Sequence, residues 1–537
     1  MKDKVPSVEE LQKKLGEFMK GLKKEYGDSI QDVKFDVFPQ ADIGKDDSTG
    51  SAVEEKKEFD LHFDLKPKDV KAYLDKYVIK QDEAKKILSI AVCDHYNHVS
   101  ECVKSDRGQK SSAAHDELAE EYTKQNVIMI GPTGVGKTYL IKTIARLIGV
   151  PFVKADATKF SETGYVGGNV DDIIRDLVNE ADGNAELAQY GIVYVDEIDK
   201  IAASSNLVGR DVSGRGVQTG LLKLMEETEV DLTSPLDPMS QMRAIMEFQK
   251  KGKLEKRTIN TKHILFFVSG AFYQLEDIIK RRLQKQEMGF GGQVESKKVD
   301  VNYTEECKSM DLVDYGFEPE FVGRLPVRVV CYELSPEDLY NILKHSRGSI
   351  IKQYKSAFKS YGIDVIFSDE SLRRIAEKAY EEKTGARALA TICEKVLREF
   401  KFELPSSEIR KFVVTEEMVE NPAEELVKVL DNLDDNKKLI ARESVKEYEN
   451  QFMSRHEIKL NFSEKAIDLI SEQAEAAGID IKLMCDKILE DYEHGLKLIK
   501  RNTGRSEFAI TEELIKDPSG TLDKWFKEYY TQQPEHA

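Results

Sequence analysis

A glycine-rich segment with one lysine and one threonine is the part of the chain best suited to binding phosphate groups. It matches the pattern G-x-x-x-x-G-K-[ST], follows the apolar run VIMI and precedes the helical pattern YLIKTIARLI. In such a loop, backbone N–H groups surround the phosphates, the lysine supplies a positive charge, and the threonine hydroxyl can ligate Mg2+. The segment predicts a site for ATP and Mg2+, made by Gly131, Pro132, Thr133, Gly134, Val135, Gly136, Lys137 and Thr138.

Two adjacent carboxylates follow the apolar run IVYV, roughly sixty residues after the glycine-rich segment. In enzymes with a phosphate-binding loop, an aspartate at this place holds Mg2+, and the next glutamate orients and deprotonates the attacking water. An apolar strand that ends in Asp-Glu would be weak evidence by itself, but its position after the loop makes it strong. We therefore expect Asp196 to bind the cofactor and the metal, and Glu197 to be catalytic.

The apolar pattern predicts the elements that must position these groups. From about residue 61 to 335, short β-branched runs alternate with helical patterns, which indicates an α/β fold with a parallel sheet. The runs are VIMI, IVYVD, HILFFVSG and VRVVCY. Beyond Pro336 the pattern becomes mainly helical, so a small helical domain is expected to follow the sheet.

The helical part of the chain repeats itself. The stretch QYKSAFKSYGIDVIFSDESLRRIAEKAY is echoed by EYENQFMSRHEIKLNFSEKAIDLISEQA, and KFVVTEEMVENP is echoed by EFAITEELIKDP. Tyr354 corresponds to Tyr448, and Cys393 to Cys485, at a nearly constant offset. Chance similarity between amphipathic helices explains this less well than a duplication.

These patterns divide the chain into four predicted parts. The Asn- and Asp-rich stretch at residues 431–436 is expected to be a turn or linker before the duplicate. The parts are an amphipathic helix and polar linker (1–60), a nucleotide-binding domain (61–335), a small domain (336–425) and a degenerate duplicate of the small domain (426–537).

Composition excludes several classes of protein. With 537 residues, 40% of them apolar and 33% charged, the chain is typical of a globular protein with several domains. A formal charge of -18 opposes binding to nucleic acids or anionic lipid. The six cysteines occur singly, without a zinc-type pair, and no apolar run approaches the roughly 20 residues that span a membrane. We expect a cytoplasmic protein with no zinc, nucleic acid or membrane partner.

The loop, the carboxylate pair and their surroundings resemble the ClpX and HslU family of AAA+ unfoldases from about residue 66 to 422. The resemblance implies an AAA+ P-loop NTPase large domain with a parallel sheet, then a small, mainly helical domain and its degenerate second copy. It also implies that Val78 and Ile79, in the segment DKYVIKQDEAK, contact the adenine base. Lys80 replaces the glycine that is usual there, so the local backbone is expected to differ.

Two further segments resemble the pore loops of these unfoldases. The sequence GYVG places Tyr165 and Val166 where the family grips a polypeptide in the central channel of a ring, and RDVSG places Arg210 in a second pore loop. An aromatic side chain grips broadly, without sequence demands, and the flanking glycines let the loop move. The alternative is a tyrosine packed in an ordinary turn.

Two arginines match positions that act on the nucleotide in this family. FEPEFVGRLP resembles the arginine-finger segment, so Arg324 would reach the γ-phosphate held by a neighbouring subunit, which requires a homo-hexameric ring. TGAR matches the sensor-2 motif, which places Arg387 over the nucleotide of its own subunit. An ordinary surface salt bridge is the alternative for either arginine. HILFFVSGAF makes Ser269 a candidate sensor-1 residue.

The resemblance is incomplete in regions that select partners. ClpX proteins usually begin with a four-cysteine zinc domain, whereas no cysteine precedes Cys93 here, so the adaptor route is expected to differ. In ClpX a loop with an Ile-Gly-Phe type tripeptide docks on the ClpP peptidase. Met288, Gly289 and Phe290, in QEMGFGGQVE, are the corresponding candidates for docking on a ClpP-like peptidase. The alternative is a glycine-rich surface loop without a partner.

Three functions remain open at this stage. The first is an ATP-dependent unfoldase and translocase of the ClpX type that acts on unfolded or tagged proteins, as the ATPase subunit of a Clp-like protease. The second is a protease-independent remodelling chaperone or an HslU-like subunit. The third is a nucleotide-switched assembly or scaffold protein. The intact Glu197, Arg324 and Arg387 favour turnover of ATP, and Tyr165 favours threading.

Overall fold

The computed structural model describes residues 63–106, 123–160, 168–202, 212–232, 257–289 and 303–516, together with residues 520 and 525. The amphipathic helix and the polar linker expected within residues 1–60 lie outside these ranges. In the described part of the chain, no helix is long and apolar enough to cross a membrane.

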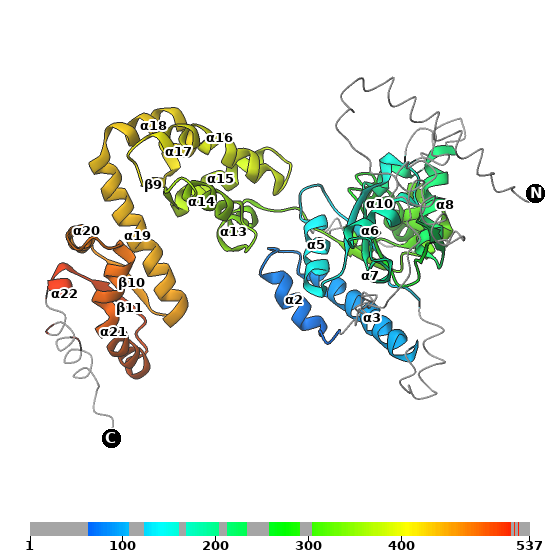
Figure 1. Ribbon diagram of the computed structural model, residues 1–537, viewed down its shortest axis with the longest axis horizontal. Coiled ribbons are helices and arrows are strands. Elements are labelled where there is room, and N and C mark those ends of the chain that lie inside the picture. Colours follow the sequence, from blue (N-terminus) through cyan, green and yellow to red (C-terminus); the bar gives the residue numbers. More distant parts are fainter. Residues whose placement is uncertain are drawn as a thin grey trace, which may run out of the picture. The chain divides into compact units, whose positions relative to one another are not determined.

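A five-stranded parallel sheet forms the centre of the first part of the chain, with the strand order β2-β3-β6-β1-β7. The helices α5, α6, α7, α8 and α10 gather around it (Figure 1, cyan to green). The strands are β1 (Val127–Ile130), β2 (Phe152–Asp156), β3 (Ile192–Asp196), β6 (Leu265–Gly270) and β7 (Val327–Val330). The sheet confirms the α/β fold expected from the sequence.

Both faces of this sheet are buried, which explains why its strands read as continuous apolar runs. Successive side chains of a strand point to opposite faces. Met129 and Tyr194 therefore join one hydrophobic cluster, whereas Ile128 and Val195 join another. The edge strand β2 is different, because Lys154 and Asp156 interrupt its apolar pattern, and the sequence analysis did not find it.

Helices and a small hairpin complete this part of the chain. The hairpin pairs β4 (Glu229–Asp231) with β5 (Thr258–Asn260) in antiparallel fashion. The α-helices are α2 (Pro67–Asp75), α3 (Asp82–Asp106), α5 (Lys137–Ile148), α6 (Asp172–Glu180), α7 (Ala185–Ala188), α8 (Val212–Met225), α10 (Leu275–Gly289), α11 (Ser309–Tyr315) and α12 (Pro319–Gly323). The 3-10 helices are η2 (Ala157–Lys159), η3 (Ile198–Ile201) and η4 (Tyr303–Glu306).

A first helical unit, residues 336–431, follows the sheet. It begins at Pro336, where the Ser335 side chain caps the helix by accepting a hydrogen bond from Asp338 N. Its two short strands, β8 and β9, pair in parallel. The elements are α13 (Pro336–His345), α14 (Ile350–Lys359), β8 (Asp364–Phe367), α15 (Asp369–Glu381), α16 (Arg387–Glu403), η5 (Leu404–Ser406), β9 (Lys411–Val414), α17 (Glu416–Glu420) and α18 (Pro422–Asp431).

A second helical unit, residues 433–516, has the same order of helix, strand, two helices, strand and helix. Its strands β10 and β11 also pair in parallel, and its core is a separate hydrophobic cluster that includes Tyr448, Cys485 and Phe508. The elements are α19 (Leu433–His456), β10 (Lys459–Phe462), α20 (Glu464–Ala477), α21 (Ile481–Thr503), β11 (Glu507–Ile510) and α22 (Glu512–Lys516).

The expected linker between the two helical units is shorter in the structure. Helix α18 ends at Asp431 and α19 begins at Leu433, so only Asn432 lies between them. Asn436, expected in a turn, lies inside α19, and its side-chain amide donates a 3.2 Å hydrogen bond to Lys411 O. Packing of α19 explains this, because its buried Ala441 and Val445 extend the helix over residues whose own preference is a turn.

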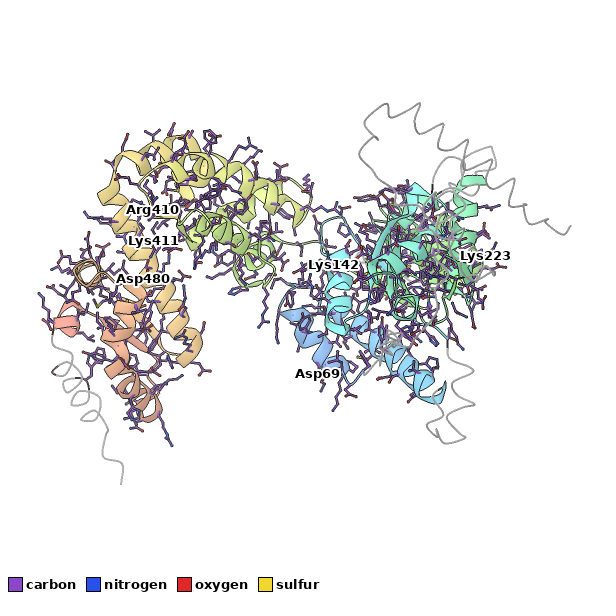
Figure 2. All side chains as sticks on the ribbon, viewed as in Figure 1. Asp69, Lys142, Lys223, Arg410, Lys411 and Asp480 are labelled. Atoms are coloured by element: carbon purple, nitrogen blue, oxygen red, sulfur yellow. The ribbon has the colours of Figure 1, made fainter. Side chains whose placement is uncertain are left out.

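Polar contacts join the two helical units. Lys411, at the start of β9, forms a 3.0 Å ion pair with Asp480, and Lys446 of α19 forms a 2.8 Å ion pair with Glu370. Figure 2 labels Lys411 and Asp480, which approach each other from the two units. The second unit thus has its own core, the buried residues of the first unit share one cluster with one face of the sheet, and partly exposed ion pairs join the two units.

Candidate nucleotide site

The glycine-rich loop lies between β1 and α5, in a conformation that only glycine adopts easily. Gly134 has φ +80° and Gly136, the residue before α5, has φ +99°. A Cβ atom added to Gly134 would stand 2.0 Å from Thr384 O, so a larger residue cannot fit there. The loop predicted from the sequence therefore has the backbone that phosphate binding requires.

Lys137 is held inside this loop. Its ammonium group donates hydrogen bonds to Gly131 O at 2.6 Å and to Pro132 O at 2.8 Å, and its side chain is buried. Burial lowers the pKa of Lys137, and the neighbouring Arg387 contributes to the same direction. The lysine is thus fixed at the first turn of α5, where a phosphate group would meet the helix N-terminus.

A cavity of about 400 Å³ opens beside this loop. This volume lies in the range of small-molecule sites. Its lining brings together residues from the loop, from the end of β3, from the end of β6 and from the first helical unit. The lining residues are Thr133, Gly134, Gly136, Lys137, Thr138, Tyr139, Tyr194, Asp196, Glu197, Asp199, Lys200, Gly270, Ala271, Tyr273, Ala386 and Arg387.

The two predicted carboxylates meet at the carboxyl end of β3, inside the cavity. Asp196 is the last residue of the strand, and Glu197 has φ +56°, a left-handed backbone that is costly for a residue with a side chain. Glu197 N donates a 3.1 Å hydrogen bond to the Asp196 carboxylate. This turn exposes the Glu197 side chain while Asp196 stays half-buried.

A chain of hydroxyl groups links the two halves of the site. Thr138 donates to the Tyr194 hydroxyl at 3.1 Å, the Tyr194 and Ser269 hydroxyls lie 2.6 Å apart, and Ser269 donates to Asp196 at 2.7 Å. Burial raises the pKa of Tyr194, so its phenol stays protonated. The structure thus connects the candidate sensor-1 residue, Ser269, to both expected Mg2+ ligands.

Sequence reasoning missed two residues of this network. Tyr194 was taken only as part of an apolar strand, and Lys154 belongs to the strand that was not found. Lys154 lies 2.8 Å from the second oxygen of Asp196. Burial alone would raise the pKa of Asp196, but the hydrogen bonds from Lys154 and Ser269 outweigh it and lower that pKa. For Tyr194, the available signal was a hydroxyl-bearing residue inside a predicted apolar strand.

The turn between α15 and α16 closes the cavity from the first helical unit. Gly385, with φ +62°, lies against Gly134, and Ala386 N donates a 2.9 Å hydrogen bond to Gly134 O. Arg387 is the first residue of α16 and lines the cavity. The small helical part therefore reaches the nucleotide loop as the sensor-2 resemblance implies.

The segment expected to contact adenine lies between α2 and α3. Val78 is buried, with a methyl group 4.0 Å from a Cβ placed on Gly136, and Ile79 is half-buried; neither residue lines the cavity. Lys80 adopts the left-handed φ of +60°, the region that glycine favours. Its ammonium group donates 2.7 and 2.8 Å hydrogen bonds to Glu333 O and the Asp338 carboxylate. Lys80 thus adopts a backbone conformation that glycine also favours.

Arg324 lies outside the cavity. It follows α12 and forms a 2.7 Å ion pair with Glu226, with its side chain about half exposed. Arg324 is absent from the described lining of the cavity in its own chain. Its position is compatible with action on a different copy of the chain.

Several predicted residues cannot be placed. Tyr165, Val166, Arg210 and Phe290 lie outside the described residues. The segment with Tyr165 is flanked by a backbone bridge between Phe160 and Gly168. These residues stay predictions.

One part of the expected docking loop differs from its prediction. Helix α10 continues through Met288 and Gly289, which the sequence analysis placed in a loop. The preceding helical run, LEDIIKRRLQKQE, extends across them because neither residue stops a helix as proline would.

Two protein-family models match the chain. A model described as an AAA domain of the Cdc48 subfamily matches residues 122–328, and a model described as the C-terminal, D2-small domain of ClpB protein matches residues 334–409. The first match contains the glycine-rich loop and the carboxylate pair, and the second contains Arg387. The two matched ranges correspond to the sheet and to most of the first helical unit.

Curated relatives are similar over about two thirds of the chain. An ATP-dependent Clp protease ATP-binding subunit ClpX of Borrelia duttonii is 41% identical over 358 residues, which are 66% of this chain and 78% of the relative. A subunit named ClpX 3 of Methylococcus capsulatus is 39% identical over 372 residues, 68% of this chain and 82% of the relative. ClpX of Treponema denticola is 38% identical over 372 residues, 68% and 84% of the two chains.

Proposed function

This chain belongs to the ClpX family of AAA+ ATPases, and from that premise we propose that it is a magnesium-dependent, hexameric unfoldase that supplies a ClpP-like peptidase with unfolded protein. The observation that carries the proposal is the convergence of the glycine-rich loop, Asp196, Glu197 and Arg387 on one cavity. A nucleotide-switched scaffold would need the loop alone, whereas the added carboxylate and arginine support turnover.

The residues of the cavity divide the chemistry among them. Lys137 and the loop amides would bind the phosphates, and Thr138 and Asp196 would hold Mg2+, whose other ligands come from phosphate oxygens and water. Mg2+ neutralises charge on the phosphates when bound. Glu197, exposed at the end of β3, would accept a proton from the attacking water, and Arg387, which also lines the cavity, would stabilise charge on the phosphates.

A ring of six copies would explain why Arg324 lies outside the cavity of its own chain. Because Arg324 lies outside the cavity of its own chain, it would act on the nucleotide of a neighbour, and a closed ring gives each site one such arginine. Its partner Glu226 would then release it at the subunit interface. A ring also gives Tyr165, Val166 and Arg210 a common central channel in which to grip a tagged or unfolded protein.

The proposal also includes a partner, a ClpP-like peptidase. The relatives carry the name of a Clp protease subunit, and Phe290, directly after α10, supplies an apolar side chain suited to a hydrophobic cleft. The helical backbone at Met288 and Gly289 differs from the loop expected for docking, and this difference is the observation that favours the second candidate, a protease-independent remodelling chaperone.

The substitution Glu197→Gln tests the enzymatic part. It removes the base but leaves the loop, so we expect ATP binding and ring assembly to persist while turnover falls by about a hundredfold or more. Binding of a fluorescent ATP analogue, light scattering and phosphate release measure the three properties. Retention of near-normal turnover would contradict the role of Glu197.

The substitution Phe290→Ala tests the partner. If this side chain enters clefts of a ClpP-like peptidase, degradation of a tagged stable protein should stop while its unfolding continues. Glu276→Ala, an exposed change at the start of the same helix, serves as the control. Unchanged degradation by the Phe290 variant would favour the remodelling chaperone.

A further inference from the structure

Lys154 is a charged residue of the site that no step above uses. It lies on β2, directly opposite Tyr194 of β3, two residues before the pair formed by Asp156 and Asp196. Its ammonium group is 2.8 Å from Oδ2 of Asp196, and the exposed fractions of the two side chains are 42% and 18%. The lysine therefore approaches the carboxylate from the solvent side of the strand pair.

The other oxygen of Asp196 is also engaged. Oδ1 accepts hydrogen bonds from Ser269 Oγ at 2.7 Å and from Glu197 N at 3.1 Å. Among the described residues, Lys154 is the only cationic side chain within 4.0 Å of this carboxylate. A metal ion that uses Asp196, directly or through water, must therefore share it with Lys154 or displace that lysine.

We infer that Lys154 is a built-in countercharge that exchanges with Mg2+ at Asp196. The ammonium group neutralises the carboxylate while nucleotide without metal enters the cavity, and it moves away when Mg2+ reaches Asp196. The inference rests on the magnesium site proposed above, and assigns Lys154 as a competitor of that metal for the Asp196 carboxylate. It requires no bond to form or break other than the ion pair.

Two measurable consequences follow, and they have opposite signs. Without Lys154, a bare Asp196 would repel the phosphates of metal-free ATP, so metal-free binding should weaken. The same bare carboxylate would be free to bind Mg2+. A lower Mg2+ concentration should therefore give half of the Mg2+-dependent change in nucleotide binding. A purely structural ion pair would not separate the two quantities, because lost stability weakens both.

The test uses the full chain with the Glu197→Gln substitution, so that nucleotide is not consumed. Lys154→Met removes the charge and keeps most of the side-chain length. We expect a fluorescent ATP analogue in EDTA to bind about two- to fivefold more weakly. The Mg2+ concentration that gives half of the Mg2+-dependent change in nucleotide binding should fall by a similar factor, the size usual for a partly exposed ion pair.

Two control variants separate this role from others. Lys154→Arg keeps the charge and should restore both values, and Lys159→Met removes an exposed lysine of η2 and should change neither. Unchanged values in Lys154→Met, or a shift of both toward weaker binding, would overturn the inference. If the parent protein bound no nucleotide under any condition, the proposed function itself would fail, and this inference with it.

Discussion

Apart from η5, the elements from α14 to α17 of the first helical unit recur in the same order in the second unit, but the equivalent turns of the two units meet different parts of the chain. In the first unit, the turn between α15 and α16 carries Gly385 and Arg387 to the nucleotide loop. In the second unit, the turn between α20 and α21 carries Gly478 and Asp480 back to the first unit, where Asp480 pairs with Lys411. The same local architecture thus lines the nucleotide cavity in the first unit and contacts the other helical unit in the second.

The comparison separates what packing needs from what the chemistry needs. Ser368 and Ser463 cap equivalent helices, and each side chain accepts a hydrogen bond from the backbone N–H three residues later, of Ser371 and Ala466 respectively. Cys393 and Cys485 are both fully buried, and burial raises the pKa of each thiol to about 12, so both remain protonated core groups. The two units therefore share packing and capping groups, whereas their turns carry different residues, Gly385 and Arg387 in the first and Gly478 and Asp480 in the second.

The largest difference is expected between Gly385→Ala and Gly478→Ala. Both glycines have positive φ, but a Cβ on Gly385 would stand 2.8 Å from the Gly134 backbone, whereas nothing lies within 4 Å at Gly478. Gly478→Ala should cost about 1 kcal/mol of stability and leave the ATPase rate unchanged. Gly385→Ala should cost about 2–4 kcal/mol and reduce the rate about a hundredfold, since it displaces the turn from the loop.

Thermal unfolding measures the stability of the Gly385 and Gly478 variants, and phosphate release measures their ATPase rates. Equal effects of the two substitutions would show that the first turn does not depend on its contact with Gly134, and would remove the proposed difference between the copies.

A smaller effect on folding is expected from Arg387→Ala and Asp480→Ala. Arg387 lines the cavity, so its loss should reduce ATP turnover about a hundredfold with little change in unfolding temperature. Asp480 forms a partly exposed ion pair with Lys411 and also caps α21 by accepting a hydrogen bond from Lys482 N, so its loss should cost about 1–2 kcal/mol and leave turnover unchanged. Hydrogen exchange at the start of α21 should increase only in the Asp480 variant; a slowed ATPase in that variant would contradict the division of roles.

The sequence predicted those parts of the site that depend on local pattern. The apolar strands β1, β3, β6 and β7 and the glycine-rich loop were found because burial on both sheet faces and phosphate binding each leave a short, continuous pattern. Strand β2 was missed because its outward residues, Lys154 and Asp156, belong to a partly exposed edge.

Features decided by distant contacts were harder to predict. The start of α19 was taken for a turn because its asparagine and aspartates favour turns, but packing on the first helical unit makes it helical. Lys80 keeps a left-handed backbone because ion pairing with Asp338, more than 250 positions away along the chain, stabilises it. The link from Thr138 through Tyr194 and Ser269 to Asp196 needs α5, β3 and β6 to lie side by side, which no local pattern reveals.

The measurement that tests the account most directly is ATP turnover by a chain that ends at Asn432, compared with the full chain. The cut removes the second helical unit with its separate core and keeps α18, whose Leu426 and Val429 belong to the core of the first part. A chain that ends at Asn421 is the control, since loss of these two side chains should destabilise the first unit by several kcal/mol, at about 2–5 kcal/mol for each large apolar group. We predict that the chain ending at Asn432 assembles and hydrolyses ATP within about twofold of the full chain, below the tenfold that 1.4 kcal/mol would produce. Failure of that chain to assemble, or a loss of turnover as large as in Arg387→Ala, would contradict the claim that the second helical unit takes no part in nucleotide chemistry.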